Sequence, residues 1–171
     1  MNRSAYKCAA IFFTACLALG GCASGNHTHQ LLDAVAAEKT ATLGPHRLYV
    51  VTTRAEAEDR NDVFSGERSE TLNFARVDVT LPRSHTPGRL EQPRSSARRD
   101  PARHLAAGEV ARYRSQDGFS TALKASIKRT DGRALLFVHG YRTPFDGSVY
   151  RMGQIVHDSG YTGTPVLFSW A

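Results

Sequence analysis

The chain has 171 residues, of which 41% are hydrophobic and 22% are charged. This composition is that of an ordinary globular protein and excludes a wholly disordered or collagen-like chain, and the length favours one domain over two. Lys and Arg outnumber Asp and Glu by 22 to 16, which gives a net charge of +6. A charge of this size bears on solubility and association and does not define a fold.

The N-terminal segment has the pattern of a secretion signal. Arg3 and Lys7 give it a positive start, and residues 8–19 are apolar but shorter than the roughly 20 residues that a membrane-spanning helix needs. Small residues then precede Cys22 in the tetrapeptide Leu-Gly-Gly-Cys, which resembles a bacterial lipobox. In such a signal, the peptide is cleaved before the cysteine, whose sulfur carries the lipid. The alternative is a plain secretory signal with an incidental cysteine at position 22.

Cleavage before Cys22 would remove the other two cysteines, Cys8 and Cys16. A mature chain with one acylated cysteine has neither a free thiol nor a disulfide, which argues against thiol chemistry. We therefore expect residues 1–21 to be a signal peptide and residues 22–46 to be a polar tether. The expected location is the cell envelope, with the membrane as partner through the lipid on Cys22. In a host with two membranes, the absence of Asp after the cysteine favours the periplasmic face of the outer membrane.

The tether contains a weak metal-site pattern. His27 and His29 are two residues apart and Asp33 follows, but a flexible segment with this spacing is a poor preorganised site. The sequence predicts no metal and no cofactor.

Two strands are predicted after the tether. Residues 47–54 are rich in β-branched and aromatic side chains, which is typical of a strand. Residues 74–81 alternate between apolar and polar, which indicates a strand with one buried face, and Pro82 ends it. A turn is expected at residues 64–68.

The segment 83–104 is predicted to be a mobile, arginine-rich loop. It carries six arginines and is interrupted by three turn-forming residues, Pro87, Gly88 and Pro93. An anion-binding surface is the alternative, and its affinity would fall steeply with salt. The segment lacks interleaved aromatic side chains and any nucleic-acid motif, so we expect no nucleic-acid partner.

The pentapeptide 118–122 loosely matches a nucleophile elbow, in which a serine lies on a sharp turn between a buried strand and a helix. Residues 112–117 are polar, so we expect no buried strand before it. Apolar residues recur with helical spacing from Phe119 to Ile127. Ser120 is therefore expected to have a structural place in a helix.

The C-terminal third predicts a strand, a helix and a second strand. Residues 134–138 form a continuous apolar run, which is typical of a strand buried on both faces. Residues 145–158 have an apolar face at helical spacing, and residues 166–170 form a second apolar run. This order is a βαβ unit with a right-handed crossover.

An apolar strand that ends in His139-Gly140, followed by a helix and another strand, resembles the α/β-hydrolase fold. Six segments in the same order are similar to bacterial esterase- or lipase-like hydrolases of unassigned substrate: 49–54, 64–68, 74–91, 137–141, the helix 145–158 and 166–170. The resemblance implies an α/β fold in which residues 47–171 are the N-terminal part of a hydrolase domain. That part would be a sheet of about four strands with crossover helices, with residues 134–138 placed centrally.

The resemblance also implies an oxyanion-binding loop after the strand 134–138. Gly140 would let the backbone approach a substrate closely, and the N–H of Tyr141, or less favourably of Arg142, would be the donor. Arg142 stands where the family often has a small polar residue such as Asn. A long cation there reshapes the oxyanion pocket or selects an acidic substrate.

The catalytic residues implied by the family have no counterparts in this sequence. The superfamily carries its nucleophile on an elbow after the next strand, followed by an acid and a histidine, and no Gly-x-Ser-x-Gly occurs here. Ser148 and Ser169 lack glycines at the elbow positions, and His139 and His157 precede the expected elbow. We therefore assign no catalytic residue and expect a sheet truncated before the elbow strand.

Two functions remain open. The first is an envelope-anchored serine hydrolase for a small ester or amide, inactive as this chain alone. The second is a non-catalytic lipoprotein, either a remnant or a binding module of the cell envelope.

Overall fold

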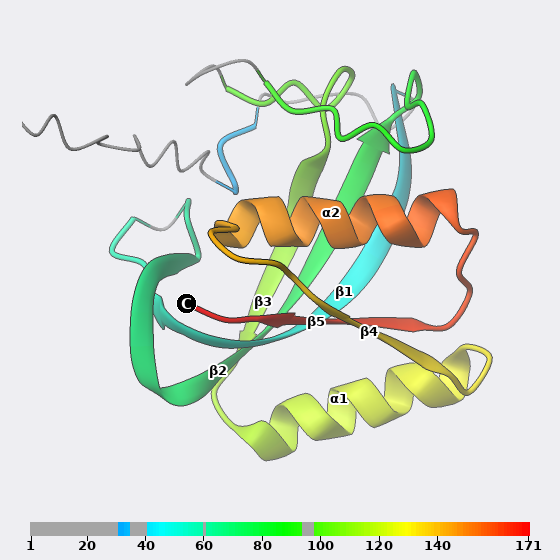
Figure 1. The fold of residues 1–171 in the computed structure, drawn as a ribbon. Helices are drawn as coiled ribbons and strands as arrows, with labels where there is room; N and C mark the ends of the chain where they lie inside the picture. The colour runs from blue at the N-terminus through cyan, green and yellow to red at the C-terminus, as the bar shows by residue number, and fades with distance from the viewer. Residues whose placement is uncertain (1–30, 35–40, 60, 94–97) are drawn as a thin grey trace, which may run out of the picture.

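The computed structural model describes residues 31–34, 41–59, 61–93 and 98–171. The expected signal peptide, Cys22, His27 and His29 lie outside the described residues. The elements are, in chain order, β1 (Thr42–Glu56), β2 (Phe64–Pro82), β3 (Ala106–Tyr113), α1 (Gln116–Arg129), β4 (Ala134–Val138), α2 (Phe145–Asp158) and β5 (Thr164–Ser169) (Figure 1). No helix in this part of the chain has the length and apolar character needed to cross a membrane.

The strands form one mixed sheet in the order β3-β2-β1-β5-β4. β2 pairs antiparallel with both β1 and β3, whereas β5 pairs parallel with both β1 and β4. The two helices cover opposite faces of this sheet (Figure 1). The α/β fold class is confirmed, and residues 134–169 form the expected strand–helix–strand unit with adjacent parallel strands.

The main core lies between α2 and the sheet. Helix α2 contributes Val149, Met152 and Val156, which pack on buried strand residues such as Val50 and Leu167. On the other face, α1 is held by Phe119, whose ring packs edge-on against Tyr49 and Tyr113 and tilted against Phe74. Because Tyr49 and Val50 are consecutive in β1, they point to opposite faces and each serves one helix.

Strand β4 lies at the edge of the described sheet, where only β5 pairs with it. The expectation of a strand buried on both faces is therefore wrong: Leu136 is 61% exposed and Val138 51% exposed. Leu135 and Phe137 point to the α2 side and are packed against the core. An unpaired edge strand with exposed apolar side chains is prone to pair with another chain.

Two sequence expectations for the first half of the domain are corrected. Residues 64–68 are the start of β2 and not a turn. The strand β3 precedes α1, but only Ala106 in it is buried, so no buried strand leads into the helix, and Ser120 lies inside the helix as expected. The domain also begins before residue 47, because β1 starts at Thr42 and Leu31 is fully buried in the core.

The described parts of the segment 83–104 are not simply a solvated loop. Arg99 is 1% exposed, and its Nη2 donates to Oδ2 of Asp146 in α2 at 3.1 Å. Its guanidinium lies 3.9 Å from the ring centroid of Tyr150, whose hydroxyl donates to the carbonyl of Leu31 at 2.9 Å. A buried cation thus ties the loop and the residues before β1 to α2.

The close approach of α2 to β2 predicts the effect of a substitution at Gly153. A Cβ at this position would lie 2.7 Å from Cγ1 of Val79, a stiff β-branched side chain. We expect Gly153→Ala to destabilise the fold by about 1–3 kcal/mol through overpacking, measured by denaturant unfolding. Gly147→Ala in the same helix is the control, since its Cβ would meet Pro144 at 3.4 Å and the helix gains intrinsic stability. Equal stability of the two variants would contradict this account.

Candidate functional site

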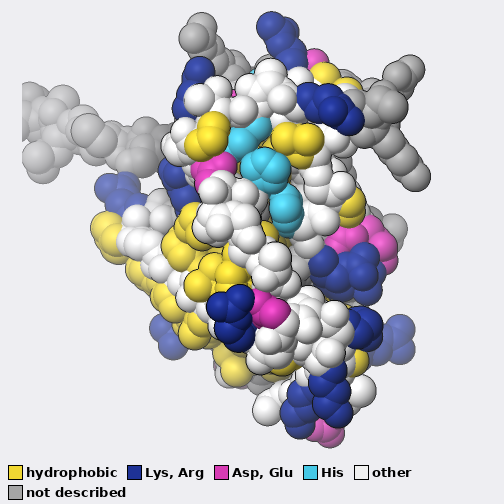
Figure 2. Space-filling model, turned by 90° about the vertical axis from the view of Figure 1, so that its right-hand side faces the viewer, with side chains coloured by type: hydrophobic (Ala, Val, Ile, Leu, Met, Phe, Trp, Pro, Cys, Tyr) yellow, Lys and Arg dark blue, Asp and Glu magenta, His cyan; other side chains and the backbone are white. Residues whose placement is uncertain are grey.

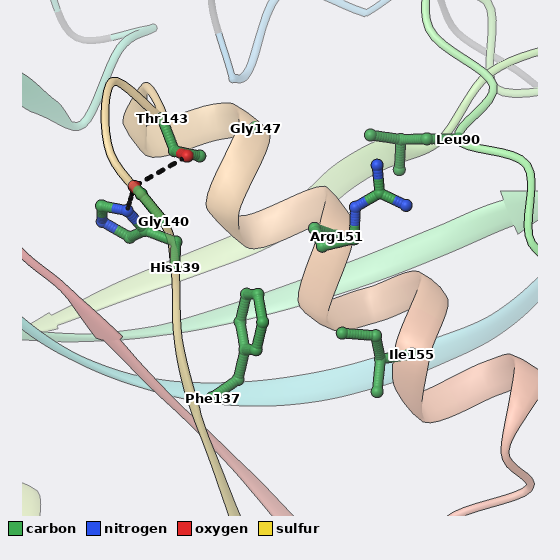
Figure 3. Close-up of a pocket in the computed structure, with 8 residues that line it drawn as sticks. All are labelled: Leu90, Phe137, His139, Gly140, Thr143, Gly147, Arg151 and Ile155. Carbon is green, nitrogen blue, oxygen red and sulfur yellow. Dashed lines mark hydrogen bonds between the residues drawn. The ribbon is translucent and has the colours of Figure 1, made fainter.

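The candidate site lies at the carboxyl ends of β4 and β5, the edge at which open parallel sheets bind ligands. The loop 139–144 leaves β4 here and leads directly into α2. A cavity of about 390 Å³ opens beside the loop, between β4 and α2 (Figure 3). Its lining residues are Leu90, Phe137, His139, Gly140, Thr143, Gly147, Arg151 and Ile155.

His139 is buried and joins the ends of the two strands. The backbone N–H of Trp170 donates to its Nε2 at 3.1 Å, so the proton of the ring lies on Nδ1, which donates to the carbonyl of Gly140 at 2.8 Å. The indole N–H of Trp170 donates in turn to the carbonyl of His139 at 3.0 Å, and the two rings stack. Both ring nitrogens are therefore engaged in holding the loop, which makes His139 a positioning residue.

The carbonyl of Gly140 accepts a second hydrogen bond, from Oγ1 of Thr143 at 3.0 Å (Figure 3). Two donors thus fix the direction of this carbonyl. In a planar trans peptide the C=O and the following N–H point in opposite directions. The N–H of Tyr141 is therefore directed away from the His139 ring and the Thr143 side chain.

Arg54, near the end of β1, holds the loop 139–144 through hydrogen bonds. The sequence patterns did not identify this residue. Its guanidinium is buried and donates to Oγ of Ser169 at 3.1 Å, to the carbonyl of Ser65 at 3.2 Å and to the carbonyl of Thr143 at 2.8 Å. Burial lowers the pKa of Arg54, and Asp146 opposes that shift. The only feature in the sequence that points to this role is an arginine near the end of an apolar strand. Arginines that are exposed to solvent occur in the same position, so the feature does not identify a buried one.

The three serines considered from the sequence do not lie on a strand-to-helix turn. Ser120 is in α1, on the other face of the sheet. Ser148 is fully buried in α2 and donates to the carbonyl of Phe145 at 2.6 Å. Ser169 comes within 3.3 Å of Nε2 of His139, but it is fully buried and accepts from Arg54. A substrate has no access to either buried hydroxyl.

The structure separates the three residues expected to form the oxyanion loop. Gly140 lines the cavity, and a Cβ there would meet no atom within 4 Å. Tyr141 is 82% exposed. Neither Tyr141 nor Arg142 is among the described residues that line the cavity. Arg142 has φ of +55°, in the left-handed region that Asn adopts more readily than other non-glycine residues. The Asn that the resemblance leads one to expect would fit this backbone better.

The positive φ of Arg142 predicts a difference between two substitutions. Arg142→Asn and Arg142→Ala both remove the guanidinium, but only Asn tolerates the left-handed conformation. We expect the Asn variant to be more stable than the Ala variant by about 1 kcal/mol in denaturant unfolding. Equal stabilities, or a more stable Ala variant, would show that the loop does not hold this conformation in solution.

Comparison with known protein families gives a match in the C-terminal third of the chain. Residues 115–171, from α1 to β5, match the family described as "Alpha/beta hydrolase of unknown function (DUF900)". No curated protein and no solved structure matches the chain. The matched segment contains β4, the loop with His139 and Gly140, and α2. The match supports the α/β-hydrolase superfamily for this part of the chain.

Proposed function

We propose that this domain is the part of an ester or amide hydrolase that supplies the oxyanion-binding loop. Its donor is the backbone N–H of Tyr141, and that of Arg142 is the less favoured alternative. The observation that carries the proposal is the orientation of the Gly140–Tyr141 peptide, held by His139 and Thr143 at its carbonyl. A donor fixed in advance stabilises a developing oxyanion at no further cost of reorganisation and contributes about 3 kcal/mol.

The cavity beside the loop supports a small substrate. Leu90, Phe137 and Ile155 make part of its wall apolar, while Arg151 adds a cation. Its volume of about 390 Å³ is at the lower end of the range for ligand sites. A short acyl group therefore fits the apolar wall.

We further propose that this chain does not hydrolyse esters by itself. Ser148 and Ser169 are fully buried, and Ser120 lies on the opposite face of the sheet from α2. Both nitrogens of His139 are engaged in loop contacts. The same observations favour the second candidate function, a binding module of the cell envelope that keeps the cavity without a nucleophile.

The loop proposal is tested by titrating the ¹⁵N-labelled chain with sodium butyrate, a short acid whose carboxylate mimics the oxyanion. We expect the largest amide shift changes at Tyr141 and Arg142, and their loss in Gly140→Val, whose side chain would occupy open space beside the loop. Gly66→Val is the matched control, because a Cβ at either glycine meets no atom within 4 Å. Butyrate shifts confined to other amides would overturn the oxyanion assignment. A fluorophosphonate probe added to the same sample should label no residue, and labelling would contradict the proposed inactivity.

We also propose that Cys22, which lies outside the described residues, carries a lipid that anchors the protein to the cell envelope. The support is the signal pattern of the sequence. Globomycin, which blocks lipoprotein signal cleavage, should cause the uncleaved precursor to accumulate. Cys22→Ala should abolish the incorporation of radiolabelled palmitate into the protein, whereas Cys16→Ala should keep it. Palmitate incorporation into the Cys22→Ala variant would refute the anchor.

A further inference from the structure

Three histidines from separate parts of the chain meet beside the end of α2. His46 lies in β1, His85 follows β2, and His157 lies in the last turn of α2. The rings of His46 and His85 contact that of His157 edge-on, at centroid distances of 5.2 and 5.5 Å. Figure 2 shows histidine side chains in a row on this flank of the molecule. Together with Glu91 and Asp158 they are called the histidine cluster below.

His85 lies between two carboxylates. Its Nδ1 is 2.7 Å from Oε2 of Glu91 and its Nε2 is 2.7 Å from Oδ1 of Asp158, while its side chain is 2% exposed. Ionised carboxylates only accept hydrogen bonds, so both bonds form only when both ring nitrogens carry protons. Burial opposes this charge, but the hydrogen bonds to Asp158 and Glu91 outweigh it and raise the pKa of His85. The geometry at His85 therefore requires an imidazolium.

The other two histidines, in contrast, cannot both be charged. Nε2 of His46 is 3.0 Å from Nδ1 of His157, which is a hydrogen bond only if one of the two nitrogens has no proton. If both rings were charged, two N–H groups would face each other. Burial, and then the proximity of His157, lower the pKa of His46. This pair is therefore stable while at least one of the two rings is neutral.

The cluster holds the loop that follows β2. Asp158 accepts the backbone N–H of Gly88 at 2.8 Å, and Glu91 accepts that of Thr86 at 3.2 Å. Gln154, which is uncharged, donates to Asp158 at 3.2 Å. Next to Glu91 in the chain is Leu90, which forms part of the cavity wall. Closure of the loop on α2 thus helps to place Leu90, together with the hydrogen bond from the backbone N–H of Leu105 to the carbonyl of Glu91 at 3.0 Å.

Among the described residues, no group of three or more His, Cys, Asp or Glu side chains has a geometry that holds a metal ion. The titratable groups that face His85 and His46 are Glu91 from the loop and Asp158 and His157 from α2. Because His85 must be charged and the His46–His157 pair must not be doubly charged, the contact between the loop and α2 depends on pH.

We propose that the histidine cluster is a pH-dependent latch, closed near neutral pH and released on either side of it, that keeps Leu90 over the cavity beside Gly140. The latch would regulate access to the site, and this consequence rests on the proposed function. The contact between α2 and the loop 85–91 does not depend on that function.

The stability of the latch changes on the acidic and on the basic side of its optimum, and these two sides are called the limbs of the pH profile. The direction of each limb follows from the linkage between proton binding and stability. A histidine whose pKa is raised by folding stabilises the closed form below pH 6.5, and this contribution is lost as pH rises through the folded pKa of His85. A histidine whose pKa is lowered stabilises the closed form above pH 6.5, and this contribution is lost as pH falls through the folded pKa of His46. The latch is therefore most stable near pH 6.5, where both contributions are complete, and it weakens on either side.

Hydrogen exchange at the amides of Thr86 and Gly88 measures the latch directly, because both donate to its carboxylates. We expect protection factors, corrected for intrinsic exchange, to be highest near pH 6.5. They should fall toward pH 5 and toward pH 8.5, by up to about tenfold per pH unit for each linked proton. Protection that stays flat across this range would overturn the proposal.

Two variants separate the limbs. His85→Gln should remove the decline at high pH, and His46→Gln should remove the decline at low pH, since Gln can donate or accept toward either form of His157. His104→Gln is the matched control, because His104 accepts the backbone N–H of Asp100 outside the cluster. Both limbs should persist in this control. Persistence of both limbs in His85→Gln and His46→Gln would also overturn the latch.

The outcomes for the latch and for the proposed function are distinguishable. Butyrate shifts at Tyr141 combined with flat protection at Thr86 and Gly88 would leave the function and remove the latch. A pH-dependent protection profile without butyrate shifts at Tyr141 would leave the latch and remove the function.

Discussion

The site depends on the need to satisfy a buried arginine. The Arg54 guanidinium has little contact with water, so each of its N–H groups must find an oxygen inside the protein. It reaches Ser169 at the end of β5, Ser65 at the start of β2 and Thr143 in the loop before α2. Because these segments are far apart in sequence, one side chain aligns the strand ends with the loop. The orientation of the Gly140 carbonyl by Thr143 follows from this alignment.

A second buried arginine, Arg99, also acts near the start of α2. Arg99 pairs with Asp146 in the first turn of α2, so it holds the residues before β1 and the arginine-rich loop on the helix. A buried ion pair is costly to break, because removal of one partner leaves a charge without compensation. Helix α2 is thus held by ion pairing near its start and by the histidine cluster at its end. The cavity lies along the helix between these two contacts.

The sequence predicted elements that have a strong local pattern, and it failed where the pattern was weak. The βαβ unit of β4, α2 and β5 was predicted because long apolar runs and helical spacing are local properties. Strand β3 was missed because small and charged residues at a sheet edge have low strand propensity. The exposure of Leu136 and Val138 was missed because burial of a strand depends on which neighbours pair with it. The family match covers the C-terminal third, where the sequence pattern was also clearest.

For the candidate site, the sequence by itself determined the fold class, the position of the loop after β4 and the residue types in it. Those features depend on order along the chain and on local periodicity. Only the tertiary structure decided that His139 engages both ring nitrogens, that Ser169 is inaccessible and that Arg54 supports the loop. It also brought His46, His85 and His157 together from three elements. Such contacts join residues up to 119 positions apart, as Tyr150 and Leu31 are, and no local pattern in a single sequence encodes which distant groups will share a hydrogen bond.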